Sequence, residues 1–182
     1  YNGKRYDFSR SDKKSIGKVH SYYGNFALCL RAYVYIRIVG AKGLRKVAEH
    51  AIINANYLFN RLKKIFEVSF KAQPMHEFVL SAEKQKQKGV KALDIAKRLL
   101  DFGIHPPTVY FPLIVSEALM IEPTENESKE MLDYFVEAME KINKEIDENP
   151  ESLKNAPHNT PVRRLDEISA ARNLNVNYYK KL

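Results

Sequence analysis

The sequence of 182 residues has one cysteine and no long apolar run. The first feature argues against a disulfide-bonded protein, and the second against a membrane-spanning one. Its one cysteine, Cys29, cannot form an internal disulfide, which favours a reducing compartment, and we expect a cytoplasmic protein. No apolar run reaches the roughly 20 residues that a membrane helix needs. The first residues are polar and lack the apolar core of a secretion signal. We therefore expect no membrane partner and no secretion.

The sequence also lacks the common catalytic signatures. It has no glycine-rich phosphate loop of the Walker or Rossmann type, and no Gly-x-Ser-x-Gly motif around a serine nucleophile. The histidines are scattered, and no histidine or cysteine falls at the spacing of zinc ligands. We therefore predict no metal site, and no local motif of these kinds identifies a catalytic residue.

A formal net charge of +8 raises the question of a nucleic-acid partner. The positive excess lies near the start of the chain and in a second cluster, Lys84, Lys86, Lys88 and Lys91. Neither run is interleaved with aromatic residues in the way that a platform for stacking bases requires. We therefore expect solvated loops or a surface for an acidic partner, and no nucleic acid. The alternative function is a basic, non-catalytic interaction module that binds nucleic acid or an acidic protein.

Two helices are expected in the first third of the chain, after an irregular segment over residues 1–25. The stretch FALCLRAYVYIRIVG, residues 26–40, is apolar on nearly every face and predicts a largely buried helix. A pair of buried strands is the alternative, because its β-branched residues alternate with tyrosine and arginine. Residues 42–65 predict an amphipathic helix, because apolar residues recur there at steps of three and four.

Strands and helices alternate only partly in the rest of the chain. Gly103 is the expected left-handed cap of a helix, three prolines make residues 104–112 extended, and residues 83–89 are predicted to form a loop. Three strands and two covering helices predict an α+β fold, a small α/β layered domain with long helices before it. The expected elements are strands at 66–70, 75–81 and 117–123, helices at 90–103 and 125–148, and a mixed tail with a short helix at 162–173.

Two segments contain polar residues that are candidates for a functional site. His76 and Glu77 begin a predicted strand, where adjacent side chains face opposite sides unless the strand end twists. Thr108 lies in the proline-framed segment, whose two consecutive prolines fix an extended backbone. Such a rigid segment suits a ligand site, and it is also an ordinary connector between elements.

The stretch IEPTENE, residues 121–127, follows an apolar strand and has two explanations. Thr124 and Glu127 fit the capping box Thr-x-x-Glu at the start of a helix. Such a cap is worth about 1 kcal/mol. The cap leaves Glu122 unexplained, because this residue stands at the end of an apolar strand and before a proline. Glu122 is therefore a candidate for the wall of an active site.

Several longer motifs together resemble one protein family. They are SIGKVHSYYGNFALCLRAYVYIRIVGAKGLRKVAEHAIINANYL, HEFVLS, ALDIAKRLLDFGIHPPTVYFPLIVSEALMIEPTENESKEMLD and APHNTPVRRLDE. In order and spacing they resemble the C-terminal third of the glycine-decarboxylating P-protein of the glycine cleavage system, from Ser15 to Arg172. The motif RRLDE near the end resembles the beta subunit of the two-subunit, prokaryotic type.

The resemblance implies a pyridoxal-phosphate-dependent enzyme of fold type I, the aspartate-aminotransferase-like class. It implies that glycine loses carbon dioxide with the cofactor ring as electron sink, and that the aminomethyl group passes to the lipoyl group of the H-protein. The implied partners are the alpha subunit, a second beta subunit and the lipoylated H-protein. The expected division of the chain is the end of the large domain and the helix leaving it at 1–40, a connecting helix at 41–65, the small C-terminal domain at 66–148 and a tail at 149–182.

The chain departs from the family in one large respect. In the family, the lysine that holds pyridoxal phosphate lies upstream of the segment matched here, and no lysine of this sequence occurs in a matching motif. We therefore expect a fragment that has no catalytic residue of its own and is inactive when isolated. A first residue, Tyr1, that is not methionine agrees with a fragment. The resemblance implies these residues as lining of the cofactor or substrate cleft: Tyr23, Gly24, Asn25, His76, Glu77, Thr108, Glu122 and Thr124.

Overall fold

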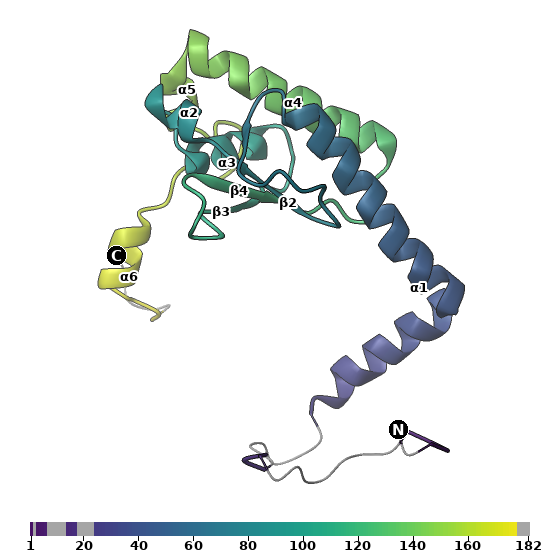
Figure 1. The fold of residues 1–182 in the computed structure, drawn as a ribbon. Coiled ribbons are helices and arrows are strands. Elements are labelled where there is room, and N and C mark those ends of the chain that lie inside the picture. Colours follow the sequence, from purple (N-terminus) through teal and green to yellow (C-terminus); the bar gives the residue numbers. More distant parts are fainter. Residues whose placement is uncertain (2, 7–13, 18–23, 178–182) are drawn as a thin grey trace. The chain divides into compact units, whose positions relative to one another are not determined.

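A computed structural model describes residues 1, 3–6, 14–17 and 24–177 of the chain. The chain divides into two compact units, Tyr1–Leu44 and Arg45–Leu182. The sheet and all helices after the first belong to the second unit, which Figure 1 shows from blue through teal and green to yellow.

The first helix, α1 (Phe26–Leu62), includes a kink at Gly40. Gly40 has φ 66° and ψ 174°, a conformation that suits glycine because it has no Cβ. Asn25 precedes the helix, and its Oδ1 accepts a hydrogen bond from the N–H of Leu28 at 3.3 Å, as in an N-cap. The helical prediction for residues 26–40 is therefore confirmed, and the alternative of two strands is wrong.

The predicted burial of residues 26–40 is wrong. The side chain of Phe26 is 77% exposed and that of Ile38 is 79% exposed. Burial needs a packing partner, and among the described residues of the first unit no residue is buried. The apolar sequence of residues 26–40 therefore predicted the helix correctly but did not predict whether the helix is buried. The large apolar residues exposed on this segment are Phe26, Leu28, Leu30, Tyr33, Val34, Tyr35, Ile36 and Ile38.

The second unit joins the end of α1 to a four-stranded antiparallel sheet with the strand order β1-β2-β4-β3. The α+β class is confirmed. Two local predictions need correction, because residues 83–89 contain a short helix and the extended segment 104–112 supplies a fourth strand. The elements are β1 (Glu67–Val68), β2 (Phe78–Ser81), α2 (Glu83–Gln87), α3 (Ala92–Asp101), β3 (Thr108–Val109), β4 (Ala118–Ile121), α4 (Lys129–Glu148), α5 (Pro150–Lys154) and α6 (Glu167–Arg172).

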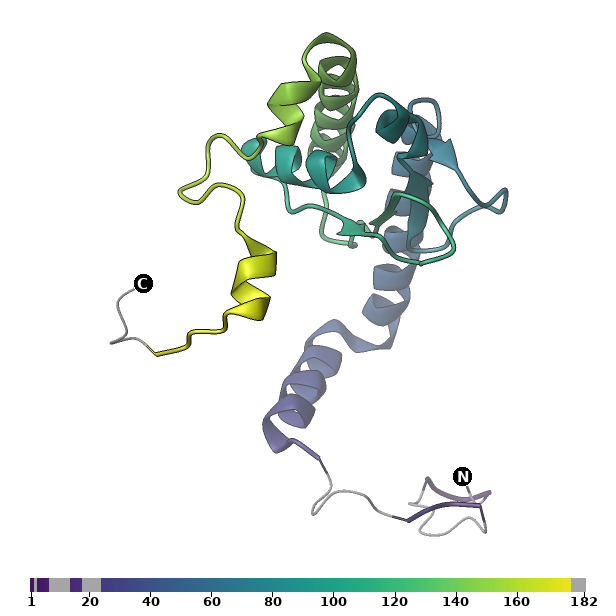
Figure 2. The ribbon, with the colours of Figure 1, turned by 90° about the vertical axis from the view of Figure 1, so that its left-hand side faces the viewer.

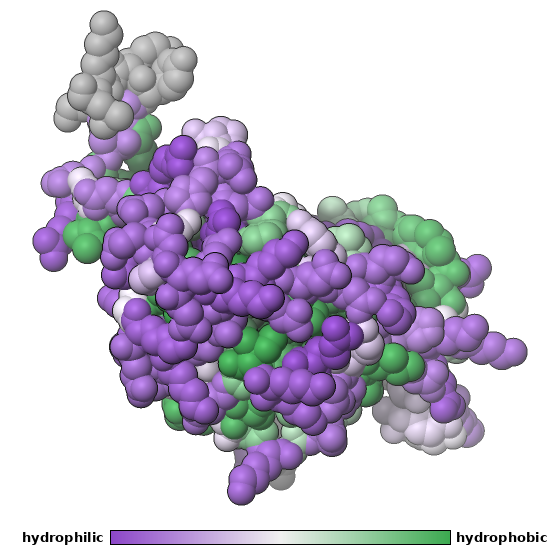
Figure 3. Space-filling model, turned by 90° about the horizontal axis from the view of Figure 1, so that it is seen from above, coloured by the Kyte–Doolittle hydropathy of each residue, from purple (hydrophilic) through white to green (hydrophobic). Residues whose placement is uncertain are grey.

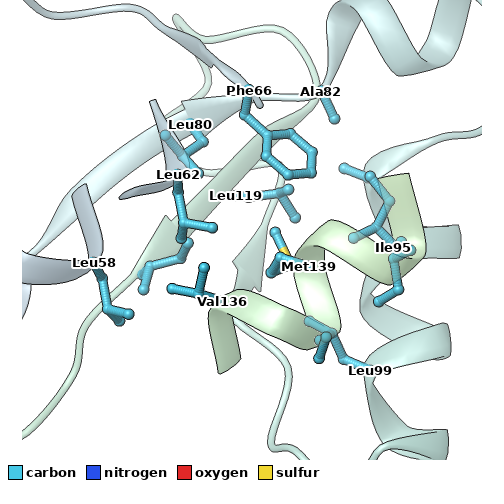
Figure 4. Close-up of a cluster of buried hydrophobic side chains, with 14 of the residues drawn as sticks. Leu58, Leu62, Phe66, Leu80, Ala82, Ile95, Leu99, Leu119, Val136 and Met139 are labelled. Atoms are coloured by element: carbon cyan, nitrogen blue, oxygen red, sulfur yellow. The ribbon is translucent and has the colours of Figure 1, made fainter. Parts of the chain in front are cut away.

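One face of the sheet carries the hydrophobic core. Leu80 of β2 pairs with Leu119 of β4, and both side chains are fully buried. Leu62 at the end of α1 and Met139 of α4 are fully buried in the same cluster. Figure 4 shows these side chains pointing into one shared interior, together with Phe66. The helices α3 and α4 lie next to each other in both ribbon views (Figure 1 and Figure 2).

The helix α4 begins later than the sequence predicted. Its N-cap is Ser128, whose hydroxyl accepts a hydrogen bond from the N–H of Met131 at 3.3 Å. Thr124 and Glu127 instead form a turn before the helix, in which the N–H of Glu127 donates to the carbonyl of Thr124 at 3.3 Å. The predicted capping box is therefore wrong. The sequence predicts an apolar stripe of Met131, Phe135, Ala138, Met139 and Ile142 on this helix. Met131 is half exposed and Phe135 is partly buried, whereas Ala138, Met139 and Ile142 are buried.

The side of the molecule on which α4 lies in Figure 1 is mostly hydrophilic. Figure 3 views the molecule from this side, and hydrophobic residues show only in patches between hydrophilic ones. The helix is therefore amphipathic, as its sequence predicts: it turns buried residues such as Met139 and Ile142 toward the sheet.

The start of α3 is held by two carboxylates that are almost fully buried. Glu117 accepts a hydrogen bond at Oε2 from the N–H of Ala92 at 2.8 Å, and Asp94 accepts one at Oδ2 from the N–H of Lys91 at 2.8 Å. Negative groups are favourable at this end because the helix dipole is positive there. Both carboxylates therefore have structural roles.

The end of α3 has the predicted glycine cap. Gly103 has φ 69°, and its N–H donates to the carbonyl of Leu100 at 3.0 Å. The N–H of Ile104 donates to the carbonyl of Leu99 at 3.2 Å. These two hydrogen bonds form a Schellman motif, which ends the helix and sends the chain into the proline segment.

The chain after α5 is fixed to α3 by Arg164. Its guanidinium donates to Asp94 Oδ1 at 2.7 Å and to the carbonyls of Ala156 and Leu153 at 2.8 and 3.1 Å. Planar guanidinium groups suit such multiple acceptors. Part of the motif APHNTPVRRLDE is therefore explained as an anchor of the tail.

Asp101 makes the second anchor of the tail. Its Oδ1 accepts the N–H groups of His158 and Asn159, each at 2.6 Å, and its Oδ2 accepts Arg98 at 2.9 Å. Burial alone would raise the pKa of the Asp101 carboxyl, but the N–H of Asn159 and the Arg98 guanidinium outweigh it and lower that pKa.

The pH dependence of stability tests this anchor. Because the folded pKa of Asp101 is lowered, its contribution is complete above its unfolded pKa of about 3.9 and is lost as pH falls through the folded value. Asp101→Asn should lower the free energy of unfolding at pH 7 by about 1–3 kcal/mol and weaken the acid dependence. Urea unfolding between pH 7 and 3 measures both effects. Asp147→Asn, at an exposed pair with Lys88, is the control, and an equal response of the two variants would contradict the anchor.

A pair of alanine substitutions tests where α4 begins. Ser128→Ala should lower the free energy of unfolding by about 1 kcal/mol, because it removes the N-cap acceptor. Thr124→Ala should cost less, because only the backbone carbonyl of Thr124 makes a hydrogen bond given by the structure. Urea unfolding of both variants measures the two losses of stability. A larger loss from Thr124→Ala than from Ser128→Ala would contradict Ser128 as the N-cap and support the predicted capping box.

Candidate functional site

A cleft of about 360 Å³ opens in the second unit between the proline segment, the end of β4 and the first turns of α4. Two of the predicted site residues, Thr108 and Glu122, are brought together on its walls. The cleft is mixed in character, with apolar side chains from α1, β4 and α4. Its lining is Leu58, Gly103, Ile104, His105, Pro106, Pro107, Thr108, Met120, Ile121, Glu122, Pro123, Glu127, Met131, Leu132 and Phe135.

The wall that carries Thr108 is rigid for local reasons. Pro106 and Pro107 each fix φ and leave the backbone with little freedom. Thr108 then enters β3 and pairs with Met120 of β4, so its position is also tied to the sheet. The predicted extended segment is thus confirmed, and its exposed Thr108 faces the cleft with a hydroxyl that can donate and accept.

The wall that carries Glu122 is made by the end of β4. The last paired residue is Ile121, opposite Phe78 of β2, and both are buried. Pro123 has no N–H and cannot continue the ladder, so the chain leaves the sheet there. Glu122 therefore stands exposed between two buried residues, at the edge of the cleft.

Thr124 and Glu127 take different places in the turn that follows. Glu127 is part of the cleft lining, and Thr124 is not. The carbonyls of both residues accept hydrogen bonds from Nδ2 of Asn54 in α1, at 2.8 Å for Thr124 and 3.3 Å for Glu127. The turn is therefore anchored to α1 through its backbone.

His76 and Glu77 lie in a bend before β2, away from the first cleft. His76 Nε2 and Glu77 Oε2 are 3.9 Å apart, and both side chains are exposed. Glu77 lines a second hollow of about 420 Å³, which is otherwise mainly apolar and shares Met120 with the first cleft. The rest of its lining is Phe59, Val68, Phe70, Ala72, Gln73, Pro74, Phe78, Val79, Phe111 and Pro112.

The predicted residues before α1 belong to the first unit. Tyr23 lies outside the described residues. Gly24 is exposed, with φ 112°, and Asn25 caps α1 as described above. The cap gives Asn25 a structural role, and the function of Gly24 and Asn25 in a cleft stays a prediction.

Sequence reasoning missed Glu117 as a buried carboxylate. It is 8% exposed and has φ 48°, and beside its bond to Ala92 it accepts Lys86 Nζ at 3.1 Å. The hydrogen bond to Glu117 and the charge of Glu83 raise the pKa of Lys86. The sequence feature that could have indicated this burial is the position of Glu117, a charged residue directly before the apolar run ALMI. Its partners are a helix end and a lysine, so it is explained as structure.

The cleft does not fit a covalent anchor for pyridoxal phosphate. No lysine is among its lining residues, and its two charged residues, Glu122 and Glu127, carry the charge that opposes a phosphate. What these residues offer is a hydroxyl at Thr108, an imidazole at His105 and two carboxylates. Over the described residues, no group of three or more histidine, cysteine or acidic side chains could hold a metal ion.

The second basic cluster predicted from the sequence is largely paired. Lys84 lies 3.8 Å from Glu67, Lys86 bonds Glu117, and Lys88 lies 2.5 Å from Asp147. The carboxylates in these pairs offset the positive charge on which binding of a polyanion such as nucleic acid would depend. Within the part of the chain that the structure describes, no helix is long and apolar enough to cross a membrane.

Comparison with known proteins gives consistent matches. The family model described as glycine dehydrogenase, C-terminal domain, matches residues 47–164. A protein of Oceanobacillus iheyensis named "Probable glycine dehydrogenase (decarboxylating) subunit 2" is 56% identical over 174 residues, which are 96% of this chain and 36% of the relative. Proteins of the same name from Chloroherpeton thalassium and Caldanaerobacter subterraneus are 59% and 58% identical, over 92% and 93% of this chain and 34% and 35% of each relative.

These matches confirm the resemblance that the motifs indicated. The chain spans about a third of the length of the curated relatives it matches. The matched family segment contains the whole sheet, the cleft and both tail anchors at Asp101 and Arg164. The chain therefore belongs to the glycine dehydrogenase C-terminal domain family.

Proposed function

We propose that this chain is a C-terminal part of subunit 2 of the glycine-decarboxylating glycine dehydrogenase, and that it serves the activity of that whole enzyme. The observation that carries the proposal is identity of 56–59% to proteins of that name through nearly the whole chain. The activity belongs to the larger protein, because this chain is equivalent to about a third of each relative.

The proposal includes the cofactor, substrate and partners of the family. The whole enzyme would use pyridoxal phosphate in a fold of type I, act on glycine in the cytoplasm, and assemble from alpha subunits and two beta subunits. The lipoylated H-protein would accept the aminomethyl group. When bound, the cofactor supplies the electron sink for decarboxylation. Residues 1–40 would end the large domain, 41–65 connect, 66–148 form the small domain and 149–182 form the tail.

In this proposal the chain supplies a wall of the active site, and its anchoring lysine comes from another part of the enzyme. Thr108 and Glu122 are the residues we assign to the wall, because they are exposed on one cleft and stand on backbone fixed by prolines and sheet pairing. Fixed polar groups assist a reaction because no reorganisation is needed when charge develops. The apolar side chains of Met131 and Phe135 would limit water on the same cleft.

The alternative of a basic binding module receives less support. Nucleic-acid binding relies on positive groups that neutralise phosphates and release counterions. Lys84, Lys86 and Lys88 already face carboxylates of the same unit. Nucleic acid is therefore no part of the proposed function.

The wall is tested in the full-length subunit by Glu122→Gln, which keeps the size of the side chain and removes its charge. We expect kcat/KM for glycine to fall about tenfold or more, which is about 1.4 kcal/mol of transition-state stabilisation. Thermal stability should hardly change, because Glu122 is exposed. Glu125→Gln is the matched control, since Glu125 lies in the same segment and outside the cleft lining. Equal effects of the two variants would exclude Glu122 from the wall.

The division of labour is tested on the isolated chain of 182 residues. It should show no saturable, specific Schiff-base absorbance with pyridoxal phosphate, beyond the weak reaction of exposed lysines, and no release of carbon dioxide from glycine, because the cleft lining contains no lysine. The full-length subunit, with its partners, should show both. Decarboxylation by the isolated chain would refute the division.

A further inference from the structure

Two asparagines, Asn54 and Asn56, lie inside α1, where asparagine is unfavourable. Its short amide competes with the helix backbone for hydrogen bonds, so asparagine is favoured at caps and turns instead. Ala55 between them is fully buried, so this part of the helix lies against the core. The two residues therefore need a compensating role, and their hydrogen bonds give one.

Asn54 holds the turn that follows Glu122. Its Nδ2 donates to the carbonyl of Thr124 at 2.8 Å and to that of Glu127 at 3.3 Å. These two carbonyls lie at the two ends of the turn, which is closed by the N–H of Glu127 donating to Thr124. One side-chain amide thus fixes the connection between β4 and α4, on the wall of the first cleft.

Asn56 holds a different loop. Its Nδ2 donates to the carbonyl of Pro74 at 2.8 Å and to that of Ile52 in its own helix at 2.9 Å. Pro74 lines the second hollow and precedes His76 by two residues and Glu77 by three. This hydrogen bond fixes the start of the bend in which both predicted residues stand.

Helix geometry explains how two residues of one helical turn form hydrogen bonds with two different loops. Residues two apart in an α-helix are rotated by about 200° about its axis, so the side chains of Asn54 and Asn56 leave nearly opposite sides. The helix itself is held firmly here, because Leu58 is buried and the hydroxyl of Tyr57 donates to Asp133 of α4. The two amides therefore extend from a fixed platform.

We propose that Asn54 and Asn56 are positioning residues, which fix two loops from one turn of α1: one on the wall of the first cleft and one beside the second hollow. Asn54 sets the segment with Glu122, and Asn56 sets the bend with His76 and Glu77. Neither touches the reacting groups in this assignment. The catalytic part of the inference rests on the proposed function, whereas the clamp itself rests on the four hydrogen bonds.

Hydrogen exchange on the chain of 182 residues tests the clamp without any activity. Asn54→Asp and Asn56→Asp keep the side-chain size and replace the donor with an acceptor that repels carbonyls. We expect faster exchange over residues 122–127 in the first variant only, and over residues 72–77 in the second only. Asn60→Asp is the matched control, since Asn60 is exposed on the same helix and its Nδ2 donates to the helix carbonyl of Asn56. Unchanged exchange, or equal loosening of both loops by either variant, would overturn the clamp.

Kinetics of the full-length subunit with its partners test the positioning role. Asn54→Asp should lower kcat/KM for glycine about tenfold at a temperature where the variant is folded, as expected for a loosened Glu122 segment. Asn54→Gln retains an amide donor and should recover part of the loss, whereas Asn60→Asp should match the wild type. A loosened segment with unchanged kcat/KM would overturn the positioning role. Failure of the proposed function would be visible separately, as a wild-type subunit that does not decarboxylate glycine.

Discussion

The packing of the last turns of α1 against the sheet is the constraint on which the second unit depends. Ala55, Leu58 and Leu62 are buried there, and each buried leucine contributes about 1.5–3 kcal/mol. A hydrogen bond such as that of Asn54 contributes a net of only about 1 kcal/mol. The apolar contacts therefore hold the helix in place. The amides of Asn54 and Asn56 then stabilise one conformation of two loops that bury few apolar residues themselves.

Buried carboxylates organise the other side of the unit in a similar way. Glu117 and Asp94 satisfy N–H groups at the start of α3, and Asp101 satisfies N–H groups of the tail after α5. A buried charge without partners would cost several kcal/mol, so each carboxylate requires its partners to be in place. The tail is thus coupled to α3, although it adds little to the apolar core. This coupling explains why the RRLDE segment belongs to the recognisable motifs: its Arg164 bonds Asp94.

Local patterns predicted what depends on local chemistry. The period of apolar residues identified α4, alternation identified the strand that contains β1, and the prolines identified the extended segment with Thr108. The failures came from distant partners. The box Thr124–Glu127 was as good a local signal as Ser128, but Asn54 binds the carbonyls of both box residues and makes them a turn. Burial of residues 26–40 failed for the same reason, because exposure depends on what else is present. Thr108 and Glu122 line one cleft, and the motifs that resemble the family were what related them, since nothing local relates residues on different strands; their role in a cofactor or substrate cleft stays a prediction.

The chemistry of the cleft agrees with the proposal that this chain serves one part of a larger enzyme. A covalent cofactor anchor needs an amine that loses its proton readily, and a phosphate needs positive charge or N–H donors. The cleft walls present a hydroxyl and two carboxylates on backbone that prolines, sheet pairing and Asn54 hold in place. Such walls orient and enclose a bound group but cannot capture it. Under the proposed function, this cleft would therefore contribute geometry, and another part of the enzyme would contribute the group that reacts.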